Sequence, residues 1–222
     1  MNLLAFDTST DTLSIAVQHG DAVWQHTGAG GAQASAALIP AIQRLLAEAG
    51  LGFDTLDAIV FGRGPGSFTG LRTACAVAQG LAFGARSGQG TPVLPVDTLL
   101  AVAEEARQQH GCTQVLAVLD ARMNDVYSAH CTWQEAPRQW STDADFGLSA
   151  PEALTLADAA LWTVAGNAHA AYGERLLPQA RHVPALPTAT ALLRLAPALL
   201  AAGAAVPASE ALPRYIRDKV AQ

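Results

Sequence analysis

The sequence predicts an α/β protein with a duplicated fold, in which two domains each carry a mixed sheet flanked by helices. Buried strands alternate with amphipathic helices, and this order is typical of a sheet with a parallel part and helices on its faces. The duplication is suggested by a repeated pattern, because an apolar strand ends at Asp7 and again at Asp120. Six residues after each aspartate a second apolar strand begins, and it places an alanine at the same offset, Ala16 or Ala129. These patterns favour two similar halves that meet near Gly111.

We predict a first domain that carries a partner interface, a smaller second domain, and a C-terminal helix with a tail, at residues 1–110, 111–187 and 188–222. In the first domain, apolar runs bounded by turn residues predict strands at residues 3–6, 13–17, 22–26, 58–61 and 92–96. Helical spacing of apolar residues predicts helices at residues 33–49, 67–83 and 98–110. Gly50 is placed to stop the first helix, because glycine readily adopts the left-handed conformation that ends helices.

The second half of the chain is less regular. Its patterns predict strands at residues 116–120, from 126 onward, at 143–148 and at 162–166. They predict helices at residues 150–160, 168–177 and 188–202. The proline-rich residues 178–187 are predicted to be a connector, and residues 206–222 an extended or partly ordered tail.

Residues 57–81 are the stretch around which the rest is arranged, and they predict a buried strand, a tight turn and a helix. Gly64 and Gly66 bracket Pro65 and allow backbone angles that a side chain would forbid. Ser67 is a good N-cap, since its hydroxyl can accept a hydrogen bond from an unpaired amide of the first helical turn. The turn is therefore expected to present free N–H groups.

Free N–H groups at a helix start attract anions, so phosphate binding at this turn has to be considered. A Walker-type loop needs a lysine where Leu71 stands, and no lysine precedes Lys219. The dinucleotide fingerprint also fails, because Gly62, Gly64 and Gly66 have the wrong spacing. The helix that follows carries small residues on most of its circumference. We therefore predict that one face of this helix meets the core and another meets a partner protein.

Composition excludes several classes of protein. Charged residues make up 14% of the chain and the net charge is −6, so no general basic field exists for RNA or DNA. The three cysteines form no Cys-x-x-Cys pair, which argues against a zinc site and a disulfide framework. The N-terminus lacks the features of a signal peptide, and the longest apolar stretch, residues 189–208, is interrupted by prolines. We expect a cytoplasmic protein that makes no contact with membranes.

Three motifs carry a family resemblance: Gly-Arg-Gly-Pro-Gly-Ser-Phe-Thr-Gly-Leu-Arg at residues 62–72, Phe-Asp-Thr-Ser at residues 6–9, and Asp-Ala-Arg-Met-Asn-Asp-Val-Tyr at residues 120–127. With these motifs the chain resembles the TsaB family, formerly called YeaZ. Members of that family belong to the bacterial machinery that makes N6-threonylcarbamoyladenosine, or t6A, in tRNA. The resemblance runs from Leu3 to about Asn167 and continues loosely at Pro213-Arg214-Tyr215.

The resemblance implies a duplicated actin-like fold of the ASKHA, ribonuclease H-like class. It also implies that the chain is not itself an enzyme and that it pairs with a catalytic paralogue, TsaD, in an assembly that includes an ATPase subunit, TsaE. In the absence of TsaD the same surface is expected to form a homodimer. The chain is expected to hold no metal or cofactor alone, with ATP or ADP placed at the junction of subunits and tRNA contacted only indirectly.

The interface implied by the resemblance lies on the helices at residues 33–49 and 67–83, which are expected to pack against the equivalent pair of TsaD. The predicted interface residues are Leu38, Ile42, Leu45, Gly64, Pro65, Gly66, Ser67, Phe68, Thr69, Leu71, Arg72, Cys75 and Ala78. One departure concerns the start of the first helix. Many family members have a histidine there where this chain has Ala34, and the resemblance leaves the consequence open.

Two small groups of polar residues have alternative interpretations. Asp7, Thr8 and Ser9 lie where actin-like ATPases place a phosphate-binding hairpin, so the resemblance implies a weak nucleotide contact. The alternative is that these side chains satisfy backbone groups of a tight hairpin. Asp120 and Arg122 are expected to form a structural ion pair rather than an active pair.

Two other classes of function stay open. An ATP-dependent phosphotransferase of the same superfold would require tight binding of ATP by the isolated chain. A metallopeptidase would require a metal, and the six histidines of the chain include no His-x-x-x-His pair.

Overall fold

The computed structural model describes residues 1–88, 90–142 and 146–217. The chain forms two units: unit 1 contains residues 1–98 and 187–214, and unit 2 contains residues 99–186 and 215–217. This division differs from the predicted one in two places. The helix at residues 98–110 packs on the second sheet, and the C-terminal helix packs on the first sheet.

Unit 1 is built on a five-stranded sheet with the strand order β3-β2-β1-β4-β5. The strand bounds are β1 Asn2–Asp7, β2 Thr12–His19, β3 Ala22–Ala29, β4 Ala58–Gly64 and β5 Val93–Asp97. The first three strands form an antiparallel meander, and β4 and β5 run parallel to β1. All five strands predicted for this part of the chain are confirmed.

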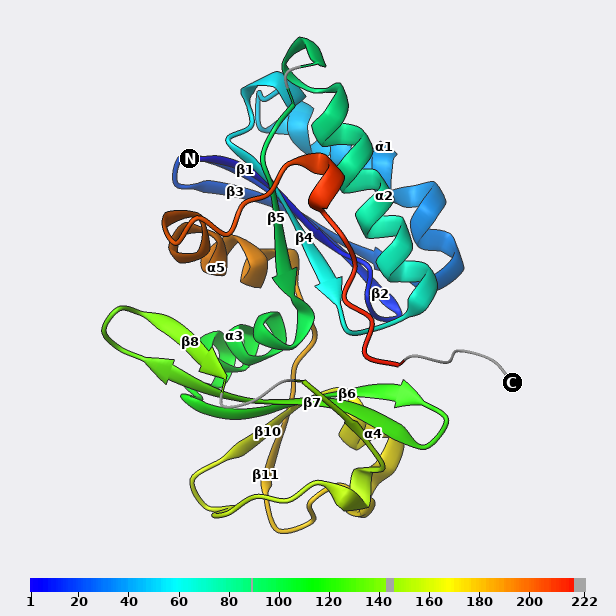
Figure 1. Ribbon diagram of the computed structural model, residues 1–222, viewed down its shortest axis with the longest axis vertical. Coiled ribbons are helices and arrows are strands. Elements are labelled where there is room, and N and C mark those ends of the chain that lie inside the picture. The colour runs from blue at the N-terminus through cyan, green and yellow to red at the C-terminus, as the bar shows by residue number, and fades with distance from the viewer. Residues whose placement is uncertain (89, 143–145, 218–222) are drawn as a thin grey trace. The chain divides into compact units, whose positions relative to one another are not determined.

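Helices cover both faces of the sheet of unit 1 (Figure 1). α1 (Ala34–Glu48) and α2 (Phe68–Gly84) cover one face, and α5 (Ala189–Ala201) covers the other. Side chains alternate along β1, so Leu4 and Phe6 join the core under α1 and α2. Leu3 and Ala5 of β1 are also fully buried, which explains why the middle of the strand is apolar on both faces.

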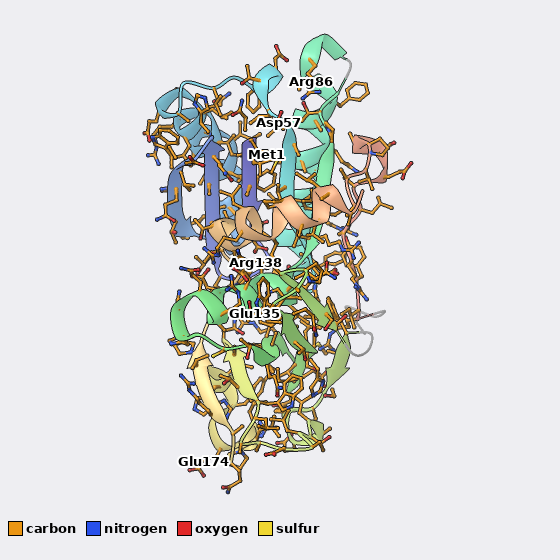
Figure 2. The ribbon with its side chains drawn as sticks, turned by 90° about the vertical axis from the view of Figure 1, so that its left-hand side faces the viewer. Met1, Asp57, Arg86, Glu135, Arg138 and Glu174 are labelled. Atoms are coloured by element: carbon orange, nitrogen blue, oxygen red, sulfur yellow. The ribbon has the colours of Figure 1, made fainter. Side chains whose placement is uncertain are left out.

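One end of unit 1 carries Met1, Asp57 and Arg86 (Figure 2). The backbone N–H of Asn2 donates to Oδ2 of Asp57 at 2.8 Å, and Nη2 of Arg86 donates to the carbonyl of Leu56 at 2.6 Å. β4 starts at this end, so the turn between β4 and α2 lies at the opposite end of the sheet.

Unit 2 is built on a sheet with the strand order β11-β10-β6-β7-β8, and β9 pairs with β7. The strand bounds are β6 Gln114–Arg122, β7 Asp125–Gln134, β8 Gln139–Thr142, β9 Gly147–Ser149, β10 Thr163–Gly166 and β11 Arg181–Pro184. The core of one face contains residues of α3 (Thr98–His110), and the core of the other contains Ala168 of α4 (Ala168–Tyr172).

The two sheets have the same topology, which confirms the predicted duplication. β6, β7 and β8 repeat the antiparallel meander of unit 1, and β10 and β11 repeat its parallel part. The repeat extends to hydrogen bonds after the first strand. The backbone N–H of Ser9 donates to Oδ1 of Asp7, and the backbone N–H of Arg122 donates to Oδ1 of Asp120, each at 2.8 Å.

Two predicted elements of the second half are wrong. The predicted helix at 150–160 is only a 3-10 turn at Pro151–Ala153. Leu154 and Leu156 both pack on the core of unit 2, and their spacing of two suits an extended chain. The predicted connector at 178–187 contains β11, an edge strand that ends at Pro184, where the missing N–H of proline is tolerated. Residues 143–145 of the strand predicted at 143–148 lie outside the described residues.

Candidate functional site

The turn between β4 and α2 packs tightly against the turn between β1 and β2. A Cβ atom at Gly70 would lie 1.9 Å from the carbonyl oxygen of Thr8, and one at Gly66 would lie 2.5 Å from the carbonyl oxygen of Ser9. Both distances are too short for any side chain. The Thr8 hydroxyl donates to the carbonyl of Gly70 at 2.7 Å, which joins the two turns. These glycines are therefore needed for the close approach of two backbone segments.

The N–H groups of the β4–α2 turn are used within the protein. The N–H of Ser67 donates to the carbonyl of Ser9 at 2.7 Å, and that of Gly64 donates to the Thr98 hydroxyl at 3.1 Å. The N–H of Gly70 donates to the Ser67 hydroxyl at 3.4 Å, which confirms Ser67 as the N-cap of α2. The expectation that this turn presents free N–H groups is wrong at these three positions, and they offer no amides to a phosphate.

Asp7, Thr8 and Ser9, the residues expected to make a weak nucleotide contact, are all buried. The Ser9 hydroxyl and backbone N–H donate to Oδ1 of Asp7 at 2.6 and 2.8 Å. These bonds are those of a tight hairpin that satisfies its own polar groups. The geometry therefore favours the structural alternative for this group.

Burial raises the pKa of Asp7 to about 6, although the hydrogen bonds from Ser9 and the Thr98 hydroxyl act in the opposite direction. Gly62 lies directly against this carboxyl group, since a Cβ atom there would come within 1.8 Å of Oδ2 of Asp7. The folded state therefore holds a proton on Asp7 more tightly than an unfolded chain does.

This raised pKa predicts a pH-dependent stability. Because the folded pKa lies above the unfolded value, Asp7 contributes stability that is complete below pH 4 and is lost as the pH rises through 6. Urea unfolding of the wild type and Asp7→Asn should show the wild type losing about 3 kcal/mol relative to the variant between pH 4 and pH 8. Asp21→Asn, at an exposed aspartate, is the control. A difference that stays constant with pH contradicts the assignment.

Six of the predicted interface residues lie in the core of unit 1: Leu38, Ile42, Leu45, Leu71, Cys75 and Ala78. Their helical spacing is that of the inward faces of α1 and α2, which pack on the sheet. Because these six residues are not on the surface, their prediction as interface residues is wrong. Gly64 and Pro65 are also buried, whereas Ser67, Thr69 and Arg72 are exposed.

The outward faces of α1 and α2 form a surface with few charges, which we call the α1–α2 face. Its exposed residues are Ser35, Ala36, Ile39, Pro40, Gln43, Arg44, Ala47 and Glu48 of α1, and Thr69, Arg72, Ala76, Gly80 and Phe83 of α2. Two of its three charges form an ion pair, since Nε of Arg44 lies 3.6 Å from Oε1 of Glu48. Two large apolar side chains are exposed on it, Ile39 at 40% and Phe83 at 75%. The two helices lie side by side on one face of the sheet (Figure 1).

Small residues follow one stripe of α2. Thr69, Thr73, Ala76 and Gly80 recur at intervals of three and four, so they share one side of the helix. At the start of the helix, the Arg72 guanidinium lies 3.8 Å from the centre of the Phe68 ring. The interface prediction did not include Ile39, Ala76, Gly80 or Phe83, although the same helical period that marks the buried face also marks this one.

Comparisons with known proteins agree on a family. A model for the family described as "TsaD: tRNA N6-adenosine threonylcarbamoyltransferase" matches residues 29–146. The "tRNA threonylcarbamoyladenosine biosynthesis protein TsaB" of Escherichia coli (strain K12) is 32% identical over 241 residues, which cover 100% of this chain and 96% of that protein. The chain belongs to the TsaB (YeaZ) family.

Other members of the TsaB family support the same assignment. The protein of the same name in Haemophilus influenzae is 43% identical over 133 residues, a stretch that covers 57% of this chain and about half, 52%, of that relative. The structure titled "YeaZ from Pseudomonas aeruginosa" is 38% identical with a TM-score of 0.88, and the match covers 97% of this chain and 99% of that one. These findings confirm the resemblance and the duplicated actin-like fold. The stretch that matches the TsaD family model includes both α1 and α2.

The motif at residues 120–127 begins with an ion pair. Nη1 of Arg122 lies 3.1 Å from Oδ2 of Asp120, and the Tyr172 hydroxyl donates to Oδ1 of Asp120 at 2.8 Å. Burial and the neighbouring Asp120 raise the pKa of Tyr172 to about 12, so this hydroxyl stays protonated and keeps donating. Asp120 is thus held at a strand end by several partners, as expected for a structural pair.

In residues 1–88, 90–142 and 146–217, no group of three or more His, Cys, Asp or Glu side chains is arranged to hold a metal ion. None of the helices there has the length and apolar character needed to cross a membrane.

Proposed function

We propose that this chain is a non-catalytic partner subunit in the synthesis of t6A in tRNA, and that it supports a catalytic subunit of the TsaD type. Membership of the TsaB family supports the place in this pathway, since its relatives are named as t6A biosynthesis proteins. The match to the TsaD family model supports a partner of related fold, because paralogues often pair through equivalent surfaces.

The observation that carries the proposal is the α1–α2 face. Exposed apolar side chains beside a stripe of small residues favour the close approach of other helices, and Arg72 is the one charged residue of α2 on this face. A pair of helices from a TsaD-type subunit would complete a four-helix arrangement here. When that subunit is absent, a second copy of this chain can occupy the same face.

A non-catalytic role is supported by the β1–β2 hairpin. Asp7, Thr8 and Ser9 are buried and hydrogen-bonded within unit 1. In the neighbouring turn, the backbone N–H groups of Gly64 and Ser67 donate hydrogen bonds to groups of the same unit. In our proposal a TsaE-type ATPase completes the assembly, and any ATP or ADP is held where subunits meet. tRNA is bound by the other subunits.

Reconstitution of tRNA modification tests this function. The reaction would contain TsaD, TsaE, the enzyme that makes threonylcarbamoyl-adenylate, and tRNA, with or without this chain. We expect t6A to accumulate only when the chain is present, and we expect the chain alone to modify nothing. Equal yields of t6A with and without the chain contradict the proposal, as does turnover of ATP by the purified chain.

A further inference from the structure

The segment after α5 packs back onto unit 1. We call residues 206–214 the C-terminal strap. It begins with a two-way backbone bridge at the edge of the sheet, in which Val93 donates to Val206 at 2.9 Å and Val206 donates to Val93 at 2.8 Å. In Figure 1 the strap is the red segment that runs beside α2. Its position shows that this part of the predicted tail is ordered.

The middle of the strap is held by α2. Ala211 is fully buried, and its carbonyl oxygen accepts hydrogen bonds from Sγ of Cys75 at 2.9 Å and from Nε2 of Gln79 at 3.0 Å. Both donors lie on a flank of α2 that the α1–α2 face does not use. The strap thus covers this flank and leaves the α1–α2 face open.

The strap ends in a cluster of three charged residues. Asp97 accepts two hydrogen bonds from Arg63, at 2.7 and 3.0 Å, and its carboxylate also lies 3.3 Å from Nη1 of Arg214. The backbone N–H of Arg214 donates to the carbonyl of Arg63 at 2.7 Å. Arg214 therefore holds Arg63 by both its backbone and, through Asp97, its side chain.

Arg63 leads directly into the turn that starts α2. Gly64 has a φ of +115°, and a Cβ atom there would lie 2.7 Å from the carbonyl oxygen of Arg214 and 2.8 Å from Cδ1 of Leu71. Gly64 is therefore packed between the end of the strap, at Arg214, and Leu71, a buried residue in the first turn of α2. A shift of Arg214 must move the turn from which the exposed stripe of α2 begins, at Thr69.

We propose that Arg214 is a positioning residue for partner binding: it fixes the β4–α2 turn, and through the turn it sets the orientation of the α1–α2 face. This inference rests on the proposed function for the identity of the partner. Its physical basis is independent of that function, because the contacts of Arg214 with Arg63 and Asp97 lie within unit 1. It also explains why the family resemblance continues at Pro213-Arg214-Tyr215, which lies outside the α1–α2 face.

Arg214→Ala, Arg214→Lys and a control, Arg217→Ala, test the inference. Arg217 is a nearby tail arginine whose ion pair with Asp125, at 2.9 Å, belongs to unit 2. Without the side chain of Arg214, Asp97 keeps its shorter pair with Arg63, so we expect the variant to fold. Lysine can supply the single donor that Arg214 directs at Asp97, so we expect the lysine variant to behave like the wild type.

Two measurements are made on each variant. Amide hydrogen exchange on the chain alone should speed up about tenfold at residues 64–72 in Arg214→Ala and stay unchanged in α1. The Kd for a TsaD-type subunit, measured by calorimetry, should rise about tenfold in the same variant. Arg217→Ala should change neither quantity.

The outcomes separate this inference from the proposed function. If the wild type binds no TsaD-type subunit, the proposed function fails, and hydrogen exchange alone then decides the positioning role. If the wild type binds and Arg214→Ala binds equally well, the positioning role is overturned. Unchanged exchange at residues 64–72 also overturns it. Should Arg214→Ala fail to fold, Asp97→Asn replaces it with the same expectations, because it keeps the shape of the acceptor and removes its charge.

Discussion

Replacing Gly70 with alanine is expected to destabilise the protein by about 3 kcal/mol or more. Helix propensity alone predicts the opposite sign, since alanine in a helix is favoured over glycine by about 1 kcal/mol. The structure reverses this expectation because the new Cβ atom would lie 1.9 Å from the backbone oxygen of Thr8. A backbone atom cannot rotate away as a flexible side chain can, so one of the two turns must move.

Gly80→Ala is a matched control in the same helix. Gly80 is exposed and no atom lies within 4 Å of a Cβ placed there. This variant should gain about 0.5 to 1 kcal/mol from helix propensity. Urea unfolding of both variants measures the two changes. If Gly70→Ala is as stable as Gly80→Ala, the two turns are not packed as described.

Ala76→Arg is expected to weaken binding of a TsaD-type subunit by about a hundredfold, because a charge without a partner would be buried in the interface. Ala76 is exposed in the middle of the α2 stripe, so the variant itself should stay folded. Binding is measured by calorimetry, and folding by circular dichroism and thermal unfolding.

Arginine at two other alanine positions provides controls for Ala76→Arg. Ala201→Arg places the same charge on an exposed alanine of α5, on the other face of the sheet, and should leave binding unchanged. Ala78→Arg should unfold the chain, since Ala78 is fully buried in the core of unit 1 and an unpaired buried charge costs more than about 3 kcal/mol. If Ala76→Arg binds as tightly as the wild type, the α1–α2 face is not the surface that binds a TsaD-type subunit.

Much of the fold could be predicted from local sequence. The strands of unit 1 follow from apolar runs and turn residues, and Ser67 was identified as an N-cap from its place before a helical pattern. The repeat of Asp7 and Asp120 pointed to duplicated sheets, which the shared topology confirms. Prediction failed where tertiary contacts override local preference, as at Leu154 and Leu156, whose chain is extended because both pack on the core of unit 2.

The candidate site was predictable only in part. Apolar spacing predicted the helix at residues 67–83, but because this helix has small residues on most sides, the prediction placed the buried Leu71, Cys75 and Ala78 at the interface. The purpose of Gly70 depends on Thr8, which is distant in sequence, so local rules predicted free N–H groups at this turn instead. The role of this chain in t6A synthesis came from its motifs and relatives rather than from any local chemistry.

The most direct test of the central claim is the yield of t6A in the reconstituted reaction when the chain is supplied as wild type, Ala76→Arg or Ala201→Arg. We predict full yield with the wild type and Ala201→Arg, and a yield with Ala76→Arg no higher than in the reaction that lacks the chain. Full modification with a folded Ala76→Arg variant would contradict the claim that this protein acts as a partner through the α1–α2 face.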